Sequence, residues 1–200
     1  MLKVNDKIAL VVCSNGKNIE DKARLKNLED ILVEIGLVPI FTKYIYKDKY
    51  GCGASPQFRA EELMSFYKNN EIKAIFDISG GDIANEILEY LDYDVIKENY
   101  KPFFGYSDLT TVLNALVSKT DKINYLYQIL NIIENEEIRT RFENTFFKKK
   151  NSLFDVNWRF LQGTKIEGEV IGGNIRCFLK LAGTEYFPKV ENKVLFIEGL

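Results

Sequence analysis

The chain has 200 residues, of which 46% are hydrophobic and 28% are charged, and its formal net charge is −2. This composition is typical of globular proteins, and the length suits one sizeable domain or one domain with part of another. The balance of 27 basic and 29 acidic residues excludes the charge pattern of a nucleic-acid-binding or membrane-surface protein.

The sequence shows no membrane span, signal peptide or cysteine motif. The longest apolar runs, such as IALVVC, are too short to span a bilayer, and the start MLKVNDKIALVVCS does not match a signal peptide. Cys13, Cys52 and Cys177 are scattered, form no metal-binding spacing and fit reduced thiols, so we expect a cytoplasmic location. The chain contains no histidine, so no imidazole-dependent mechanism can be completed within it.

Strand-like and helix-like segments alternate along the first 120 residues. Short apolar, β-branched runs predict strands, some with their following turns, over residues 7–16, 37–46, 72–79 and 101–107. Apolar residues at helical spacing predict helices over 18–36, 55–70, 80–91 and 108–119. Gly36 suits the end of the first helix, and Ser55-Pro56 suits the start of the second. The alternation predicts an α/β fold, with a parallel sheet flanked by helices as in Rossmann-like or flavodoxin-like domains.

The pattern changes after residue 119. Residues 125–150 predict mostly helix with a basic end, and residues 154–174 predict strands and turns. Residues 175–200 predict a helix, a loop and a last strand, which stops one residue after a glycine. We place a boundary near 155–165, which divides the chain into an α/β domain over 1–157 and a linker with an incomplete, β-rich C-terminal domain over 158–200. We expect residues 168–200 to depart from the first domain and to leave Leu195, Phe196 and Ile197 without full cover.

Ser107 lies between a predicted strand and a predicted helix. A serine there can be held on a tight turn at the carboxyl edge of a parallel sheet, as in a nucleophile elbow. The elbow motif Gly-x-Ser-x-Gly is half present, because Gly105-Tyr106-Ser107-Asp108 is followed by Leu109. The alternative is that Ser107 or Asp108 merely caps the helix, and the local pattern alone favours the cap.

Gly80-Gly81 also follows a predicted strand and opens a helix. A glycine pair lets the backbone approach a ligand and present N–H groups, although a tight turn explains the pair equally well on its own. Two such turns from neighbouring strands at one sheet edge favour a ligand site, and we expect them to face one pocket. The acidic residues Glu89, Asp92 and Asp94 allow a metal or acid–base role, but a charged helix end is the favoured interpretation.

The stretch ISGGDIANEILEYLDYDVIKENYKPFFGYSDLTTVLNALVSKT resembles the signature region of the LD-carboxypeptidase family of serine peptidases, and within it the microcin C immunity branch. Its Gly-Gly loop, its NEILEYLDYD run and its KPFFGYSDLT run match the family pattern in order. Three later motifs also match. They are EGEVIGGN (Glu167–Asn174), GTEYFP (Gly183–Pro188) and VLFIE (Val194–Glu198). The resemblance covers most of residues 70–120 and 158–200.

The resemblance implies a Ser–Glu–His triad in that chain order. Ser107 matches the nucleophile and Glu198 the triad glutamate, while Gly80, Gly81 and the amide of Asp108 match the oxyanion hole. No residue here matches the histidine. Three further departures occur: Gly199 replaces a usual aspartate, NYLYQIL lacks a small-Gly-Pro turn, and CSNG replaces a usual Pro-Ser turn.

The implied function is hydrolysis of an amide bond in muropeptides or in a peptidyl-nucleotide antibiotic such as microcin C, with no metal or organic cofactor. The implied partner is therefore a small peptide or peptidyl-nucleotide, with neither nucleic acid nor membrane, and the family suggests a homodimer. The main alternative is a non-catalytic binding protein on the same fold, because the general base is absent from the chain. An obligate half-enzyme completed by another chain is a third interpretation.

Overall fold

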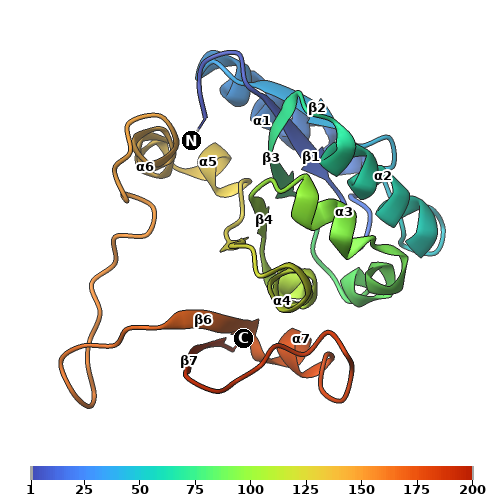
Figure 1. Ribbon diagram of the computed structural model, residues 1–200. Helices are drawn as coiled ribbons and strands as arrows, with labels where there is room; N and C mark the ends of the chain where they lie inside the picture. The colour runs from blue at the N-terminus through green and yellow to red at the C-terminus, as the bar shows by residue number, and fades with distance from the viewer. Residues whose placement is uncertain (1, 200) are drawn as a thin grey trace.

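The computed structural model describes residues 2–199 (Figure 1). The strands are β1 (Lys7–Val11), β2 (Val38–Phe41), β3 (Ile72–Asp77), β4 (Phe103–Gly105), β5 (Tyr125–Leu126), β6 (Glu169–Asn174) and β7 (Lys193–Glu198). The α-helices are α1 (Lys22–Glu34), α2 (Pro56–Lys68), α3 (Tyr93–Glu98), α4 (Thr110–Thr120), α5 (Asn131–Glu134), α6 (Glu136–Phe146) and α7 (Ile175–Leu179). The 3-10 helices are η1 (Ile19–Asp21), η2 (Ala84–Tyr90) and η3 (Ser107–Leu109).

The main sheet has the strand order β2-β1-β3-β4-β5, and every neighbouring pair is parallel. This is the flavodoxin-like order, with its topological switch point at β1 and β3. The predicted parallel α/β fold is therefore confirmed. Because the strands are parallel, the loops after β1, β3 and β4 all leave from the carboxyl edge.

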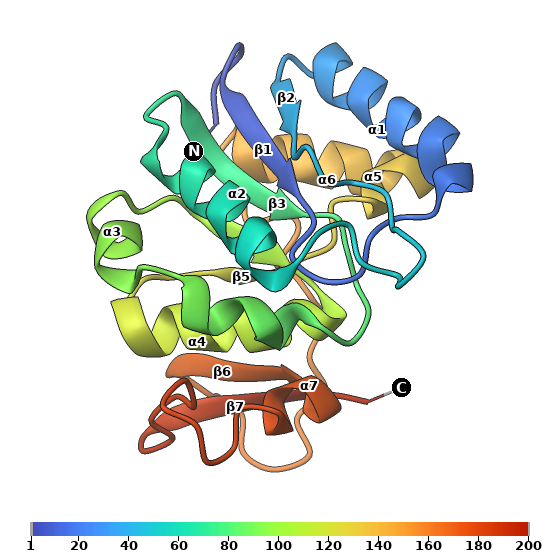
Figure 2. The same cartoon turned by 90° about the vertical axis from the view of Figure 1, so that its right-hand side faces the viewer.

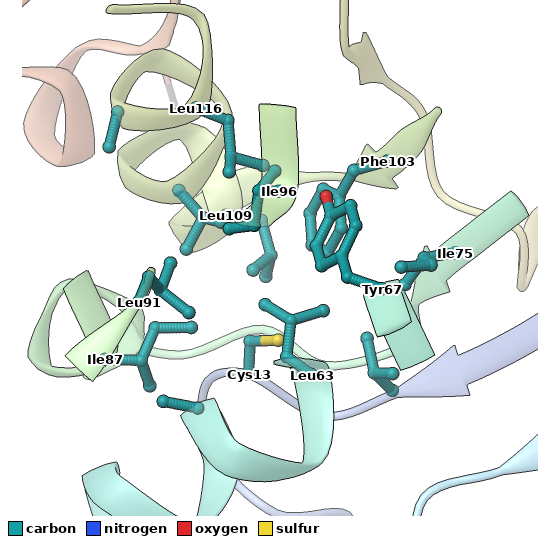
Figure 3. Packing of buried hydrophobic residues seen from close by; sticks show 14 of the residues in the cluster. Cys13, Leu63, Tyr67, Ile75, Ile87, Leu91, Ile96, Phe103, Leu109 and Leu116 are labelled. Carbon is teal, nitrogen blue, oxygen red and sulfur yellow. The ribbon is translucent and has the colours of Figure 1, made fainter. Parts of the chain in front are cut away.

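Helices cover both faces of this sheet (Figure 2). Helices α2, α3 and α4 and the helix η2 enclose one apolar core, part of which Figure 3 shows around Leu63, Tyr67 and Phe103. Helices α1 and α6 enclose the other core, where Phe104 stacks between Phe76 and Tyr125 at ring-centroid distances of 4.4 and 4.7 Å. Among residues 2–199, every helix is too short or too polar to traverse a lipid bilayer.

Local sequence explains most helix positions. Helix α1 buries the expected stripe of Leu25, Leu28, Ile31 and Leu32. Ser55 caps α2 as predicted, since its side chain accepts a hydrogen bond from the Phe58 amide and Pro56 occupies the first turn. Asp92 likewise caps α3 by accepting from the Val95 amide, which is the charged-helix-end role favoured for this acidic run.

Three expectations about local structure were wrong in detail. Residues 80–91 were expected to open an α-helix, but residues 84–90 form the 3-10 helix η2. Residues 125–150 are mostly helical as predicted, in α5 and α6, but they begin with a fifth strand, β5, that was not predicted. Residues 155–168 form neither helix nor strand, and strand structure resumes only at β6. The proposed boundary between residues 157 and 158 falls in this irregular segment and stays a prediction.

The C-terminal residues form a second, two-stranded parallel sheet that lies against α4 (Figure 2). The Asn114 side chain donates to the Gly172 carbonyl at 2.8 Å and accepts from the Gly172 amide at 2.9 Å, so it docks the edge of β6 onto α4. This segment thus contacts α4 while it forms a sheet of its own, and its expected departure from the first domain stays a prediction. The expected exposure of its apolar side chains is confirmed for Leu195 and Ile197, which are 54% and 51% exposed.

This docking predicts the effect of Asn114→Ala. The change leaves both polar backbone groups of Gly172 without their partner, so we expect a loss of about 2 kcal/mol in the free energy of unfolding. Hydrogen exchange at residues 169–174 should also become faster than in the unmodified chain. The exposed Asn131→Ala in α5 is the control, and an equal effect of both changes in denaturant titrations would contradict the docking role.

Candidate active site

Ser107 lies on a strained turn directly after β4. Its φ of +57° lies in the left-handed region, which is unfavourable for residues other than glycine. The backbone at Gly105 also lies close to Leu109 across this turn, because a Cβ atom on Gly105 would lie 2.6 Å from the Cβ of Leu109. The N-cap residues of η3 and α4 are Tyr106 and Leu109, and neither makes a side-chain capping bond. The interpretation of Ser107 or Asp108 as a helix cap is therefore wrong, and the strained strand-to-helix turn has the form of an elbow.

The Gly80-Gly81 loop follows β3 at the same edge of the sheet. Gly81 has a φ of +135°, and a Cβ atom there would lie 1.8 Å from the Asn15 side-chain oxygen. That oxygen accepts a hydrogen bond from the Asp82 amide at 2.9 Å, so the loop after β1 supports this loop. A Cβ atom on Gly80 would meet no atom within 4 Å. Glycine is thus required at 81, while Gly80 faces open space.

The side chain of Asp108 joins these loops. Its carboxylate is fully buried and accepts hydrogen bonds from the Ser14 hydroxyl at 2.6 Å and from the Ala84 amide at 2.8 Å. Its other oxygen pairs with the Lys180 ammonium at 2.8 Å. The turn that carries Ser107 is therefore tied to the loops after β1 and β3 and to the end of α7.

A second buried carboxylate lies beneath these loops. Asp77, the last residue of β3, accepts from the Cys13 amide at 2.7 Å and from the Ser79 amide and hydroxyl at 2.6 and 2.5 Å. Burial raises the pKa of Asp77, and these hydrogen bonds lower it in part. Burial, and then the charge of Asp77, raises the pKa of the Cys13 thiol well above its usual value. Cys13 is thus a structural thiol and a poor nucleophile at neutral pH.

Arg59 supplies the matching buried cation from α2. Its guanidinium donates to the carbonyl oxygens of Cys13 at 2.5 Å and of Ile83 at 3.2 Å, and it pairs with Glu86 at 2.6 Å. One side chain therefore holds backbone from the loops after β1 and β3. Such multiple donation is characteristic of the planar guanidinium group.

Glu198 reaches the region from β7. It pairs in register with Asn174 of β6, whose amide donates to the Thr110 hydroxyl at 3.1 Å in the first turn of α4. Burial raises the pKa of the Tyr106 phenol, and the charge of Glu198 and a hydrogen bond with that carboxylate raise it further. Tyr106 immediately precedes Ser107, and the expected closeness of Glu198 to the serine turn stays a prediction.

Two cavities among residues 2–199 lie away from this edge of the sheet. One, of about 110 Å³, lies between α4 and β6, and the other, of about 330 Å³, lies by Phe104, Tyr125 and Phe146. Ser107 lines neither, so the expected shared pocket of the two turns stays a prediction. Within residues 2–199, no three cysteine, aspartate or glutamate side chains are grouped as metal ligands.

Sequence reasoning missed four side chains of this region: Ser14, Asn15, Arg59 and Lys180. For Asp108 it considered an oxyanion-hole amide or a helix cap, and it did not foresee that the carboxylate connects the loops. The polar pair Ser14-Asn15 lies in the loop after β1, and a polar turn at the switch point of a parallel sheet is a usable signal. Arg59 and Lys180 gave no signal, because both lie in ordinary helical patterns.

Comparison with known proteins gives the same fold and assigns the family. A family model for the LD-carboxypeptidase N-terminal domain matches residues 8–128, and one for the LD-carboxypeptidase C-terminal domain matches residues 167–200. These are the two parts that the parallel sheet and the small second sheet define. The chain belongs to the LD-carboxypeptidase family.

Individual relatives agree with this assignment. A putative carboxypeptidase of Treponema pallidum is 25% identical over 99% of this chain and 66% of its own length. The microcin C7 self-immunity protein MccF of Escherichia coli is 28% identical over 98% of this chain and 67% of its own, and MccF has been solved in complex with aspartyl sulfamoyl adenosine. A solved MccF-like protein of Bacillus anthracis is 26% identical, with a TM-score of 0.84 over 99% of this chain and 68% of that chain. The chain spans about two thirds of the length of the curated relatives it matches.

The Asp108 contacts predict the effect of Asp108→Asn. A neutral amide of the same shape cannot accept from all three donors, and its own N–H group faces one of them. We expect a loss of about 3 kcal/mol in the free energy of unfolding, because breaking a buried ion pair leaves a polar group uncompensated. In Asp30→Asn, the control, an exposed pair with Lys26 is lost, which should cost about 0.5 kcal/mol or less. Similar midpoints for both variants in urea denaturation would contradict this role.

Proposed function

We propose that this chain carries the nucleophile-bearing part of a serine peptidase of the LD-carboxypeptidase type. The observation that carries the proposal is Ser107 at φ +57° on a strand-to-helix turn. The next residue, Asp108, joins this turn to the end of the Gly80-Gly81 loop by accepting a hydrogen bond from the Ala84 amide. A strained serine at the carboxyl edge of a parallel sheet exposes its hydroxyl beside free backbone amides. Family membership supports the same reaction class.

The residues take distinct roles in this proposal. The Ser107 hydroxyl attacks the scissile carbonyl, and the amides of Asp108 and of the Gly80-Gly81 loop stabilise the oxyanion that forms. Glu198 orients an imidazole and stabilises its charged form. The 200 residues contain no histidine, so that base comes from outside them.

The proposed substrate is a small peptide or a peptidyl-nucleotide with an amide bond near a carboxylate or a nucleotide. Muropeptides and microcin C-like antibiotics both fit this description, and the MccF complex supports the second. The proposal includes a cytoplasmic location, no metal or organic cofactor, no nucleic-acid or membrane partner, and a homodimer. A non-catalytic binding protein on the same fold is the alternative, and the missing base favours it for the 200 residues taken alone.

The absence of a base predicts that the 200-residue chain alone has no enzymatic turnover. Glu198 cannot replace the imidazole, because a carboxylate is a much weaker base than an imidazole for a serine hydroxyl at neutral pH. Losing the general base should lower the rate by about 10⁴-fold to 10⁶-fold. Chromatographic assays with an LD-muropeptide and with an aminoacyl sulfamoyl nucleotide measure this.

Both assays have a clear contrary result. Robust turnover that Ser107→Ala abolishes would show that a base other than histidine operates and that the proposed triad is wrong. Where a histidine is supplied from outside these residues, turnover should appear and should be lost in Ser107→Ala.

Ligand binding tests the substrate class without requiring turnover. We expect saturable binding of aspartyl sulfamoyl adenosine in isothermal titration calorimetry. Gly80→Val should weaken binding by about tenfold or more, because its side chain enters open space without a backbone clash and would occupy ligand volume. The exposed Asn85→Ala on η2 is the control. Absence of binding to the unmodified chain would argue against a peptidyl-nucleotide site.

A further inference from the structure

Lys180 makes two contacts that connect separate loops of the candidate site. Its ammonium donates to the Asp82 carbonyl oxygen at 2.8 Å and to the Asp108 carboxylate at 2.8 Å. Asp82 directly follows the Gly80-Gly81 pair, and Asp108 directly follows Ser107. One cation from the end of α7 therefore binds both loops that carry the proposed oxyanion-hole amides.

The charges make the contact to Asp108 strong. The Asp108 side chain is fully buried, and the Lys180 side chain is only 24% exposed. A hydrogen bond between ionised groups with little water nearby is stronger than one between neutral groups. Without Lys180, the buried carboxylate would lose its cationic partner and would keep neutral donors such as the Ser14 hydroxyl and the Ala84 amide.

We propose that Lys180 is a positioning residue that fixes the Gly80-Gly81 loop relative to the Ser107 turn. The relevance of Lys180 to catalysis rests on the proposed function, but the bridge between the two loops does not. An ammonium group has three donors, so it can bind two acceptors from different loops at once. Oxyanion stabilisation depends on the distance between the donating amides, here those of Asp108 and of the Gly80-Gly81 loop. A side chain that binds both loops fixes that distance.

Arg176 provides a matched comparison on the same helix. It pairs with the Asp82 carboxylate at 2.8 Å, but both side chains are more than half exposed. It makes no contact with Asp108 among the hydrogen bonds and ion pairs of residues 2–199. Removing Arg176 thus removes one positive charge from α7 without removing the bridge between the loops.

The test is hydrogen exchange measured by mass spectrometry on the ligand-free chain. In Lys180→Met, exchange at residues 79–84 and at residues 106–110 should become about tenfold faster, because each loop loses a charged hydrogen bond. Lys180→Arg should restore slow exchange in both loops, since a guanidinium can donate to both acceptors. Arg176→Met should leave residues 106–110 unchanged.

The contrary result is faster exchange confined to α7 and β6, which would reduce Lys180 to a docking contact and overturn the proposal. If Lys180→Met does not fold, Lys180→Gln is measured below its unfolding temperature, with the same two outcomes. Affinity for aspartyl sulfamoyl adenosine is measured in parallel. Loosened loops with no ligand binding in any variant, including the unmodified chain, would support the positioning role and count against the proposed function alone.

Discussion

The candidate site depends on the burial of one carboxylate. Asp108 is withdrawn from water, and a buried charge without partners would cost several kcal/mol. The partners come from three places, namely Ser14 after β1, Ala84 after β3 and Lys180 at the end of α7. Satisfying this one group therefore requires the loops to converge, and that convergence holds Ser107 on its strained turn.

Topology explains why the loops are free to converge. Strands β1 and β3 are neighbours in the sheet, but α1, which follows β1, covers one face, while η2 and α3, which follow β3, cover the other. Their connections therefore diverge at the carboxyl edge, which is where open α/β folds bind ligands. Asn15 extends from the β1 side toward Gly81, where any side chain would clash with it. Asp77 and Arg59 then satisfy backbone groups beneath these loops. Backbone groups that lose their partners where β1 ends are thus paired with these buried side chains.

The fold could be predicted further than the site. The alternation of strand-like and helix-like segments was enough to predict the parallel sheet, and Ser55 identified the start of α2. Both signals depend on residues that are near one another in the sequence. Strand β5, with two residues, was too short to give a pattern. The local sequence around Ser107 favoured a helix cap, yet the Asp108 side chain turns to partners 94 and 72 residues away. Such partners are selected by tertiary structure, and no local spacing encodes them.

Helix α4 links the two parts of the proposed catalytic arrangement. Its first residues continue the turn that carries Ser107, and Thr110 and Asn114 on the same helix dock β6 through hydrogen bonds to Asn174 and Gly172. Strand β6 in turn fixes the register of β7, which places Glu198 opposite Asn174. Ile171 of β6 and Leu181 after α7 are buried, so apolar packing adds to these hydrogen bonds, while Leu195 and Ile197 of β7 remain half exposed. A displacement of β6 along α4 would therefore move Glu198 relative to Ser107, which makes the Asn114 contact as relevant to the chemistry as to stability.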